Sequence, residues 1–335
     1  MLRSFLYPFL IIILTVILSV SCEANEYRIE FDRYQSDISG TSNIQSLYDI
    51  SQAIQDDIFE DVCFKMITSL PLTYWNLAIG HEYYGHGYNA RKYNIDIKQY
   101  NILPPSVDLE LPENLHKSSN IIIGGIRFNR KLEDSFLKDG MINHFDYRKS
   151  IMLFQSRLIA FRTMYDSEGS DFDLFIENSK SIYPNTKIDK YLQRSINMTL
   201  IDPSFWLNCG VLTESFIKNK DIKYTFRFIP VINYNIYPTA VTRTIGLLFK
   251  NSRIDYEFGK DIYNDSIQGF NLEYINIPIK SWNIDWNIDM KLHIVEGCES
   301  SLLTTVKTNN NIYFRYKYQF RKYDTGYVFS VGLRF

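Results

Sequence analysis

The chain has 335 residues, 45% of them hydrophobic and 16% aromatic, and its 36 basic and 38 acidic residues leave a net charge of −2. This length suits two ordinary domains or one elaborated domain, and the apolar content excludes a disordered chain. The near-neutral charge gives no electrostatic reason to expect nucleic acid as a partner. Many tyrosines, phenylalanines and isoleucines favour β-sheet or a membrane boundary.

The first residues have the features of an export signal. Arg3 supplies a positive charge, residues 9–20 form an apolar run, and small residues precede a cleavage point after Ala24. We therefore expect residues 1–24 to be a signal peptide and the mature chain to be exported. An uncleaved anchor is the alternative, but the run is shorter than the roughly 20 residues of a spanning helix. A lipoprotein acylated at Cys22 is a further alternative.

Apolar residues between positions 46 and 94 recur every three or four residues, which predicts helices. We expect Pro71 to begin the second of these helices. A further helix is predicted over 144–165, and another over 191–216 with a break before Pro203. Residues 25–220 are therefore expected to form a mainly helical domain.

After residue 220 the hydrophobic period changes from about four to two. From Trp282 to Ile294 apolar and polar residues alternate, as in a strand with one apolar and one polar face. Similar alternation recurs to the end of the chain and predicts about eight antiparallel strands, to which residues 26–34 and 121–128 could add. The expected fold class is therefore α+β.

Two architectures suit these strands. In a membrane barrel the apolar face meets lipid and the polar face fills the lumen, whereas in a soluble β domain the apolar face packs in the core. Strands of about ten residues match the 9–11 or so that cross the hydrocarbon of a bilayer. The alternating apolar residues of the last strand end at the terminal Phe335.

This last strand, with Tyr327, Phe329, Val331 and Leu333 before Phe335, resembles the closing strand of bacterial outer-membrane β-barrels. The resemblance implies an antiparallel β-barrel over 221–335, outer-membrane lipid as a partner, and the bacterial outer membrane as the location. A soluble β domain in the periplasm is the alternative.

The strongest chemical signal is the sequence GHEYYGHG at positions 80–87. His81 and His86 are five positions apart, so in a regular α-helix they point about 140° away from each other. A one-residue π-type bulge, which Gly85 would permit, brings the two imidazoles together. Such bulges are frequent at functional sites.

The segment resembles the HExxGH motif of the dipeptidyl-peptidase III zinc peptidases over six residues. The resemblance implies that His81 and His86 bind zinc and that Glu82 is the catalytic glutamate. Zn²⁺ held by two imidazoles and a carboxylate keeps one position for water, lowers the pKa of that water toward ~7, and leaves its proton to a neighbouring glutamate. For the third ligand we expect Glu133, on a predicted second helix, with His144 and Glu110 as rivals.

Arg91 follows His86 by about one helical turn and is a candidate substrate-binding residue. Its guanidinium could pair with a substrate carboxylate or with a transition-state oxyanion. The alternative is a solvated cation that interacts with the helix dipole.

These features predict an exported, envelope-located zinc metallohydrolase, most directly a peptidase that acts on a peptide or protein. One alternative is a non-catalytic outer-membrane β-barrel protein with a degenerate metal site, serving adhesion, transport or a structural role. Another is a hydrolase of lipid or cell-wall amides, which the same metal chemistry would serve.

Overall fold

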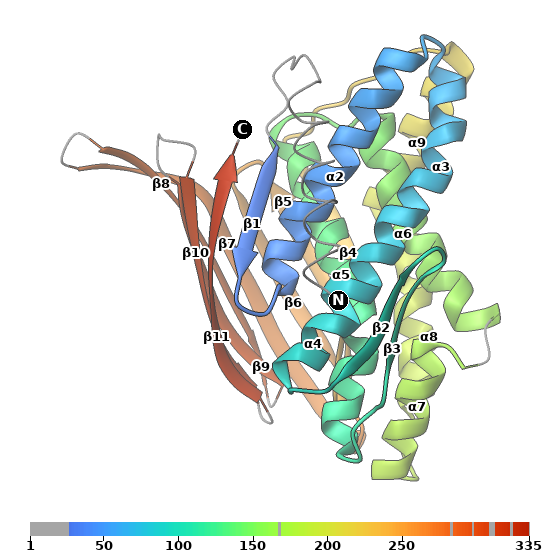
Figure 1. The fold of residues 1–335 in the computed structure, drawn as a ribbon, viewed down its shortest axis with the longest axis vertical. Helices are drawn as coiled ribbons and strands as arrows, with labels where there is room; N and C mark the ends of the chain where they lie inside the picture. The colour runs from blue at the N-terminus through green and yellow to red at the C-terminus, as the bar shows by residue number, and fades with distance from the viewer. Residues whose placement is uncertain are drawn as a thin grey trace.

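The computed structural model describes residues 27–166, 169–281, 284–296, 298–307, 312–321 and 324–334. The expected signal peptide, Cys22 and the terminal Phe335 lie outside these residues. The fold is α+β, as predicted, with the helices gathered on one side of a large antiparallel sheet (Figure 1). In the described part of the chain, no helix combines the length and apolar character needed to cross a membrane.

Helices dominate the chain as far as residue 218, as the apolar spacing predicted, interrupted by one hairpin. The helical elements are α2 (Asp37–Ile58), α3 (Val62–Ile79), the π-helix η1 (Gly80–His86), α4 (Gly87–Lys92), α5 (Leu115–Ile142), α6 (Tyr147–Asp166), α7 (Asp171–Ile182), α8 (Ile188–Met198), the 3₁₀-helix η2 (Thr199–Ile201) and α9 (Pro203–Lys218). The hairpin consists of β2 (Ile97–Ile102) and β3 (Pro105–Leu109).

Two local expectations were wrong. Pro71 lies inside α3 rather than at its start, because the Asp61 side chain accepts the N–H of Phe64 and caps a helix that begins at Val62, nine residues before the proline. Residues 121–128 form part of α5 and not a strand. Helices and the sheet bury this stretch on all sides. Its apolar residues therefore form a continuous run, and such a run does not distinguish a strand from a helix.

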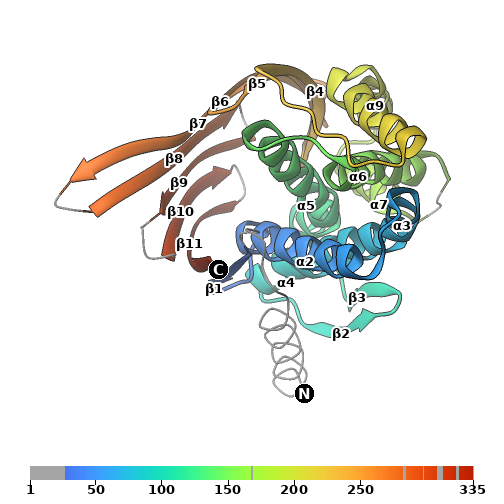
Figure 2. The ribbon, with the colours of Figure 1, turned by 90° about the horizontal axis from the view of Figure 1, so that it is seen from above.

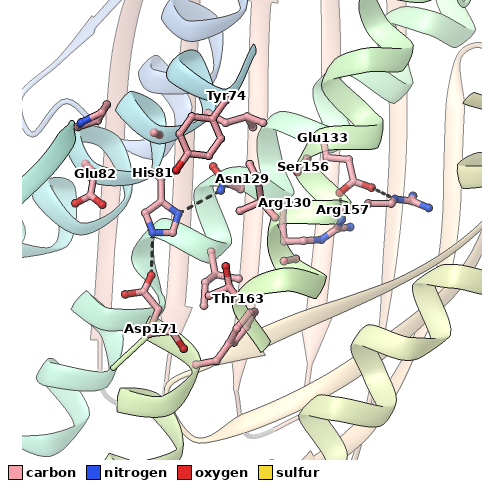
Figure 3. A pocket seen from close by; sticks show the side chains of 18 of the residues that line it. Tyr74, His81, Glu82, Asn129, Arg130, Glu133, Ser156, Arg157, Thr163 and Asp171 are labelled. Carbon is pink, nitrogen blue, oxygen red and sulfur yellow. Dashed lines mark hydrogen bonds and ion pairs between the residues drawn. The ribbon is translucent and has the colours of Figure 1, made fainter. Parts of the chain in front are cut away.

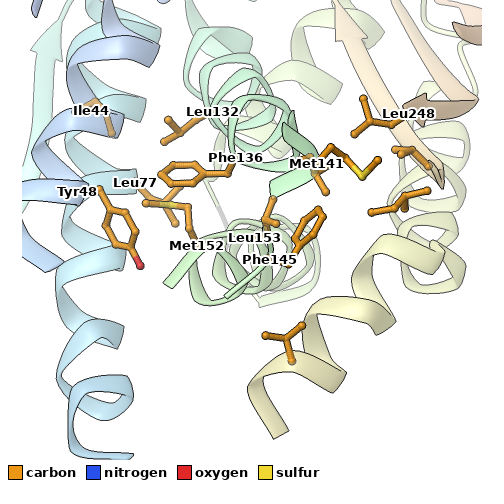
Figure 4. Packing of buried hydrophobic residues seen from close by; sticks show 14 of the residues in the cluster. Ile44, Tyr48, Leu77, Leu132, Phe136, Met141, Phe145, Met152, Leu153 and Leu248 are labelled. Atoms are coloured by element: carbon orange, nitrogen blue, oxygen red, sulfur yellow. The ribbon is translucent and has the colours of Figure 1, made fainter. Parts of the chain in front are cut away.

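Helix α5 is the central element of the helical layer. Its residues Phe128, Leu132 and Phe136 pack in the main core cluster with side chains from α2, α3 and α6 (Figure 4). The rings of Phe136 and Tyr48 meet edge to face, with centroids 5.5 Å apart. Each fully buried side chain of this size contributes about 1.5–3 kcal/mol of hydrophobic stabilisation. The same cluster includes Leu248 of the sheet, so the helices and the sheet share one core.

Within the described residues the sheet has nine strands, each antiparallel to its neighbours. Residues 28–32 add the strand that the sequence allowed, and β1 pairs with the last strand, β11. The order β1-β11-β10-β9-β8-β7-β6-β5-β4 is formed by β1 (Arg28–Asp32), β4 (Phe228–Tyr237), β5 (Ala240–Phe249), β6 (Ser252–Asp261), β7 (Ser266–Ser281), β8 (Ile284–Val295), β9 (Glu299–Lys307), β10 (Ile312–Arg321) and β11 (Asp324–Arg334).

The described strands do not close into the expected barrel, because β1 and β4 are the two edges of the sheet. Helix α2 packs against β1 and β11, whereas α5 and α9 pack against β4. Viewed from above, the sheet curves around α5, and the helical layer stands where the two edges would have to meet (Figure 2). The antiparallel sheet is therefore open and wrapped around a helix.

Over β6 and β7 the concave face of the sheet is charged and meets a charged stripe of α5. Lys138 of this stripe pairs with Glu273 of β7 at 2.7 Å, and Asp134 pairs with Arg253 of β6 at 2.9 Å. Arg253 is buried and also donates to Asp255 at 2.7 Å. Buried charges need such partners, because an unpaired ion in the interior is strongly destabilising.

The convex face of the sheet is apolar and exposed. One row of register partners crosses seven neighbouring strands, from β5 to β11, with an exposed apolar or tyrosine side chain at every step. Its exposed fractions reach 56% at Ile254 and 71% at Tyr327. This distribution reverses that of a soluble sheet, in which the apolar face is buried. The row is Leu247, Ile254, Leu272, Leu292, Leu302, Tyr318 and Tyr327.

Replacing Arg253 tests whether the charges on the concave face are paired as described. We expect Arg253→Ala to lower the free energy of unfolding by about 3–5 kcal/mol, because it leaves the buried Asp255 carboxylate without its cation. Denaturant unfolding of the full chain measures this change. Lys98→Ala is the control, because Lys98 pairs with Glu110 at the exposed surface and should change little. A loss below about 1 kcal/mol in Arg253→Ala would contradict this role.

Candidate metal centre

The motif at residues 80–87 forms the widened turn that its spacing required. Helix α3 continues into the π-helix η1 and then into α4 without a break in the helical backbone. The wider turn places His81 and His86 on one side, with ring centroids 4.7 Å apart and ring planes at 76°. The predicted π-type bulge is therefore confirmed, and it brings together two imidazoles that a regular helix would separate.

Glycine contacts allow η1 to lie directly on α5. A Cβ atom on Gly85 would lie 2.4 Å from Cα of Gly125, and a Cβ on Gly125 would lie 2.3 Å from Nε2 of His81. Neither position has space for a side chain, so the close approach of the two helices requires glycine. Gly124 has the same role, because its Cβ would meet the backbone of Gly85.

The outer nitrogens of both histidines have partners on α5. His86 donates from Nδ1 to the carbonyl of Ile121 at 2.7 Å, and Nδ1 of His81 lies 3.2 Å from the side-chain amide nitrogen of Asn129. Oδ1 of Asn129 is buried without a partner, so with the amide turned over it would accept from His81 Nδ1. With the amide in that orientation and both rings neutral, the two Nε2 atoms carry the lone pairs, as in metal-binding histidines.

A carboxylate that the sequence did not indicate completes the group. Oδ2 of Asp171, at the start of α7, lies 2.8 Å from His81 Nε2 and 3.1 Å from His86 Nε2. Figure 3 shows Asp171 and Asn129 on opposite nitrogens of the His81 ring. No spacing rule links Asp171 to the motif, because α5, α6 and the loops around them separate the two segments.

Glu82 lies beside the histidines but faces another partner. Its Oε2 accepts the backbone N–H of Val107 in β3 at 3.0 Å. Donor atoms of His81, Glu82 and His86 nevertheless lie within 4.8 Å of one another. His81 and Glu82 line a cavity of about 290 Å³, which Asp171 also lines, so a small ligand could reach the group (Figure 3).

The structure does not bring the expected third ligand to the histidine pair. Glu133 lines the same cavity, but it accepts from Arg157 at 2.8 Å and also pairs with Arg130. His144 lies beside Asp146, with 3.4 Å between its Nε2 and a carboxylate oxygen. Glu110 pairs with Lys98 at the exposed surface of the hairpin. Its position on a predicted helix downstream of the motif suggested Glu133, but two neighbouring guanidinium groups hold its carboxylate.

Arg91 supports the local structure with its guanidinium. It donates to the carbonyls of Tyr34 at 2.9 Å, Gln35 at 3.1 Å and Tyr83 at 3.0 Å, and to the hydroxyl of Tyr100 at 2.5 Å. These bonds tie the start of the chain and the hairpin to η1. All three nitrogens of the Arg91 guanidinium therefore donate hydrogen bonds within the protein.

Burial alone would lower the pKa of His86, but the adjacent Asp171 carboxylate outweighs burial and raises the pKa to about 9. Burial would likewise raise the pKa of Asp171, but the two imidazoles hold it well below its usual range. Without a metal, His86 is therefore protonated near neutral pH and forms an ion pair with Asp171. A metal ion that binds here must displace that proton, so its affinity rises with pH.

Comparisons of the chain with known protein families, with curated proteins and with solved structures give no match. The interpretation of this site therefore rests on its geometry and chemistry.

The His86–Asp171 pair predicts how the stability of metal-depleted protein depends on pH. The pKa of His86 is raised from 6.5 to about 9, so the stabilisation is complete below about pH 6.5 and is lost as the pH rises through about 9. Denaturant unfolding across this range should show the decline in the native chain and a flatter curve in Asp171→Asn. Parallel curves for the two proteins would contradict the pairing.

Proposed function

We propose that the protein is a zinc-dependent hydrolase that acts on peptide or other amide bonds. The observation that carries the proposal is that one oxygen of Asp171 lies 2.8 Å from Nε2 of His81 and 3.1 Å from Nε2 of His86, at a cavity that His81, Glu82 and Asp171 line. Two imidazoles with neighbouring carboxylates form a donor set that suits Zn²⁺. Nδ1 of His86 donates to the carbonyl of Ile121, as in metal-binding histidines, and the side-chain amide of Asn129 lies beside Nδ1 of His81.

The residues of the site have different roles in the proposed reaction. A bound zinc ion would supply Lewis acidity and lower the pKa of water. His81 and His86 would hold it, and Glu82 is the general base, because its carboxylate adjoins the pair and, among the described ion pairs, it is not held by a lysine or arginine. The bond from Val107 to Glu82 orients that carboxylate.

A peptide substrate is favoured over a lipid or cell-wall amide by the hairpin beside Glu82. In the described chain β3 pairs only with β2, and Val107 directs its backbone N–H toward the site. An unpaired strand edge recognises extended peptides through main-chain hydrogen bonds. Pro105, at the start of the same strand, lines the cavity.

Single substitutions test the metal site and the base separately. We expect His81→Ala and His86→Ala to lose bound zinc, because each removes one imidazole of the pair. Glu82→Gln should keep zinc and lose about 100-fold or more in peptide hydrolysis, because it removes only the base. Zinc content by elemental analysis and cleavage of a peptide library measure the two effects.

His144→Ala is the matched control, because this histidine lies outside the cavity and should retain both properties. Native protein that takes up no zinc would contradict the metal site. Full activity in Glu82→Gln would contradict the proposed base and favour another group on the cavity wall.

We further propose that the protein is exported and that the convex face of the sheet contacts the hydrocarbon of the bacterial outer membrane. The proposal is supported by the exposed apolar row across seven strands and by the confinement of the charges around it to the concave face. Over β6 and β7 the face toward α5 is polar and the opposite face is apolar, which is the pattern of lipid-facing sheets.

Replacing the leucine at the centre of the exposed row with arginine tests whether this face contacts lipid. We expect the native chain to float with vesicles of phosphatidylethanolamine and phosphatidylglycerol, and Leu292→Arg to float less, because arginine in hydrocarbon costs about 2–4 kcal/mol. Ile58→Arg is the control, since Ile58 is an exposed apolar residue of α2 in the helical layer. A native chain that stays monodisperse without detergent and does not float would contradict lipid contact.

A further inference from the structure

We propose that Asp171 is the third protein ligand of the metal. This inference rests on the proposed function and assigns the position for which the sequence suggested Glu133. The ligand set is then two neutral imidazoles and one carboxylate, with Glu82 left free as the base. A set of this kind suits a catalytic metal site, which keeps one position for water or substrate.

Two distances place one oxygen of Asp171 beside the Nε2 atoms of both histidines. The single oxygen Oδ2 of Asp171 lies 2.8 Å from one Nε2 and 3.1 Å from the other. Ligand atoms around tetrahedral Zn²⁺ lie about 3.3 Å apart, since each is about 2.0–2.1 Å from the ion. Both distances from Asp171 are within about half an ångström of that separation.

The charge of Asp171 is available to a cation. Its ion pairs are with His81 and His86, whose own charge is lost when they act as neutral metal ligands. Glu133 differs, because Arg130 and Arg157 already neutralise it and its side chain is almost fully buried. Of these two carboxylates on the cavity wall, Asp171 is therefore the one whose negative charge can stabilise a bound metal ion.

The position of Asp171 is fixed by local sequence and by packing. Ser170 caps α7 by accepting the N–H of Asp173, which sets Asp171 in the first helical turn. The next residue, Phe172, is fully buried in a cluster with Ile122 and Ile126 of α5. The helix that carries Asp171 therefore packs on the same helix that positions His81 and His86. This shared support preorganises the three side chains.

Metal titration of the full chain tests the assignment. Metal-depleted native protein, Asp171→Ala and Asp171→Asn are titrated with ZnCl₂ by calorimetry. We expect both variants to lose at least about 100-fold in affinity, because a direct ligand matters no less than the outer partners that tune it. Asp173→Ala is the matched control on the same helical turn and should bind like the native chain. Circular dichroism identifies variants that fail to fold, and the isosteric Asp171→Asn guards against that outcome.

The visible spectrum of bound Co²⁺ provides a second measurement. Replacing an aspartate that only supports the structure would leave this spectrum unchanged. Loss of a ligand alters the coordination of the ion, so the visible spectrum of the Co²⁺ form should differ between the native chain and Asp171→Asn. Native affinity and an unchanged spectrum in both Asp171 variants, with zinc lost in His81→Ala, would overturn the assignment and leave the metal site standing. No zinc binding by the native chain would overturn the proposed function with it.

Discussion

The contact between η1 and α5, where backbone meets backbone, is the constraint on which the site depends. Gly85, Gly124 and Gly125 leave no room for a Cβ atom, so the two helices meet at a distance that other residues would prevent. At that distance the carbonyl of Ile121 and the amide of Asn129 reach the outer nitrogens of the histidines. The widened turn brings the rings together, and the glycines allow α5 to hold them in one orientation.

Helix α5 links this site to the sheet, because its opposite faces have opposite character. One face carries Phe128, Leu132 and Phe136 into the core of the helical layer, and the other carries Asp134 and Lys138 to charged partners on the concave sheet face. Over β6 and β7 the sheet therefore has its polar face inside and its apolar face outside. We interpret this inversion as the reason that the strand pattern resembles a membrane barrel although the described strands remain open.

The sequence predicted what depends on local periodicity and did not predict what depends on tertiary contact. Alternation identified the strands, and the five-residue spacing of His81 and His86 required the π turn that the structure contains. The openness of the sheet could not be predicted from the sequence. Alternation of apolar and polar residues indicates which side chains share a face of a strand, but it does not indicate whether the first and last strands of the sheet pair with each other. The approach of Asp171 was likewise hidden, since it depends on how α7 packs against α5.

The most direct test of the central claim is anomalous diffraction at the zinc absorption edge from crystals of the zinc-loaded full chain. The geometry of η1 predicts a single strong peak within bonding distance of Nε2 of both His81 and His86. A peak bound to only one of these nitrogens, or zinc held elsewhere with the two rings turned apart, would contradict the claim that the widened turn exists to place two imidazoles on one ion.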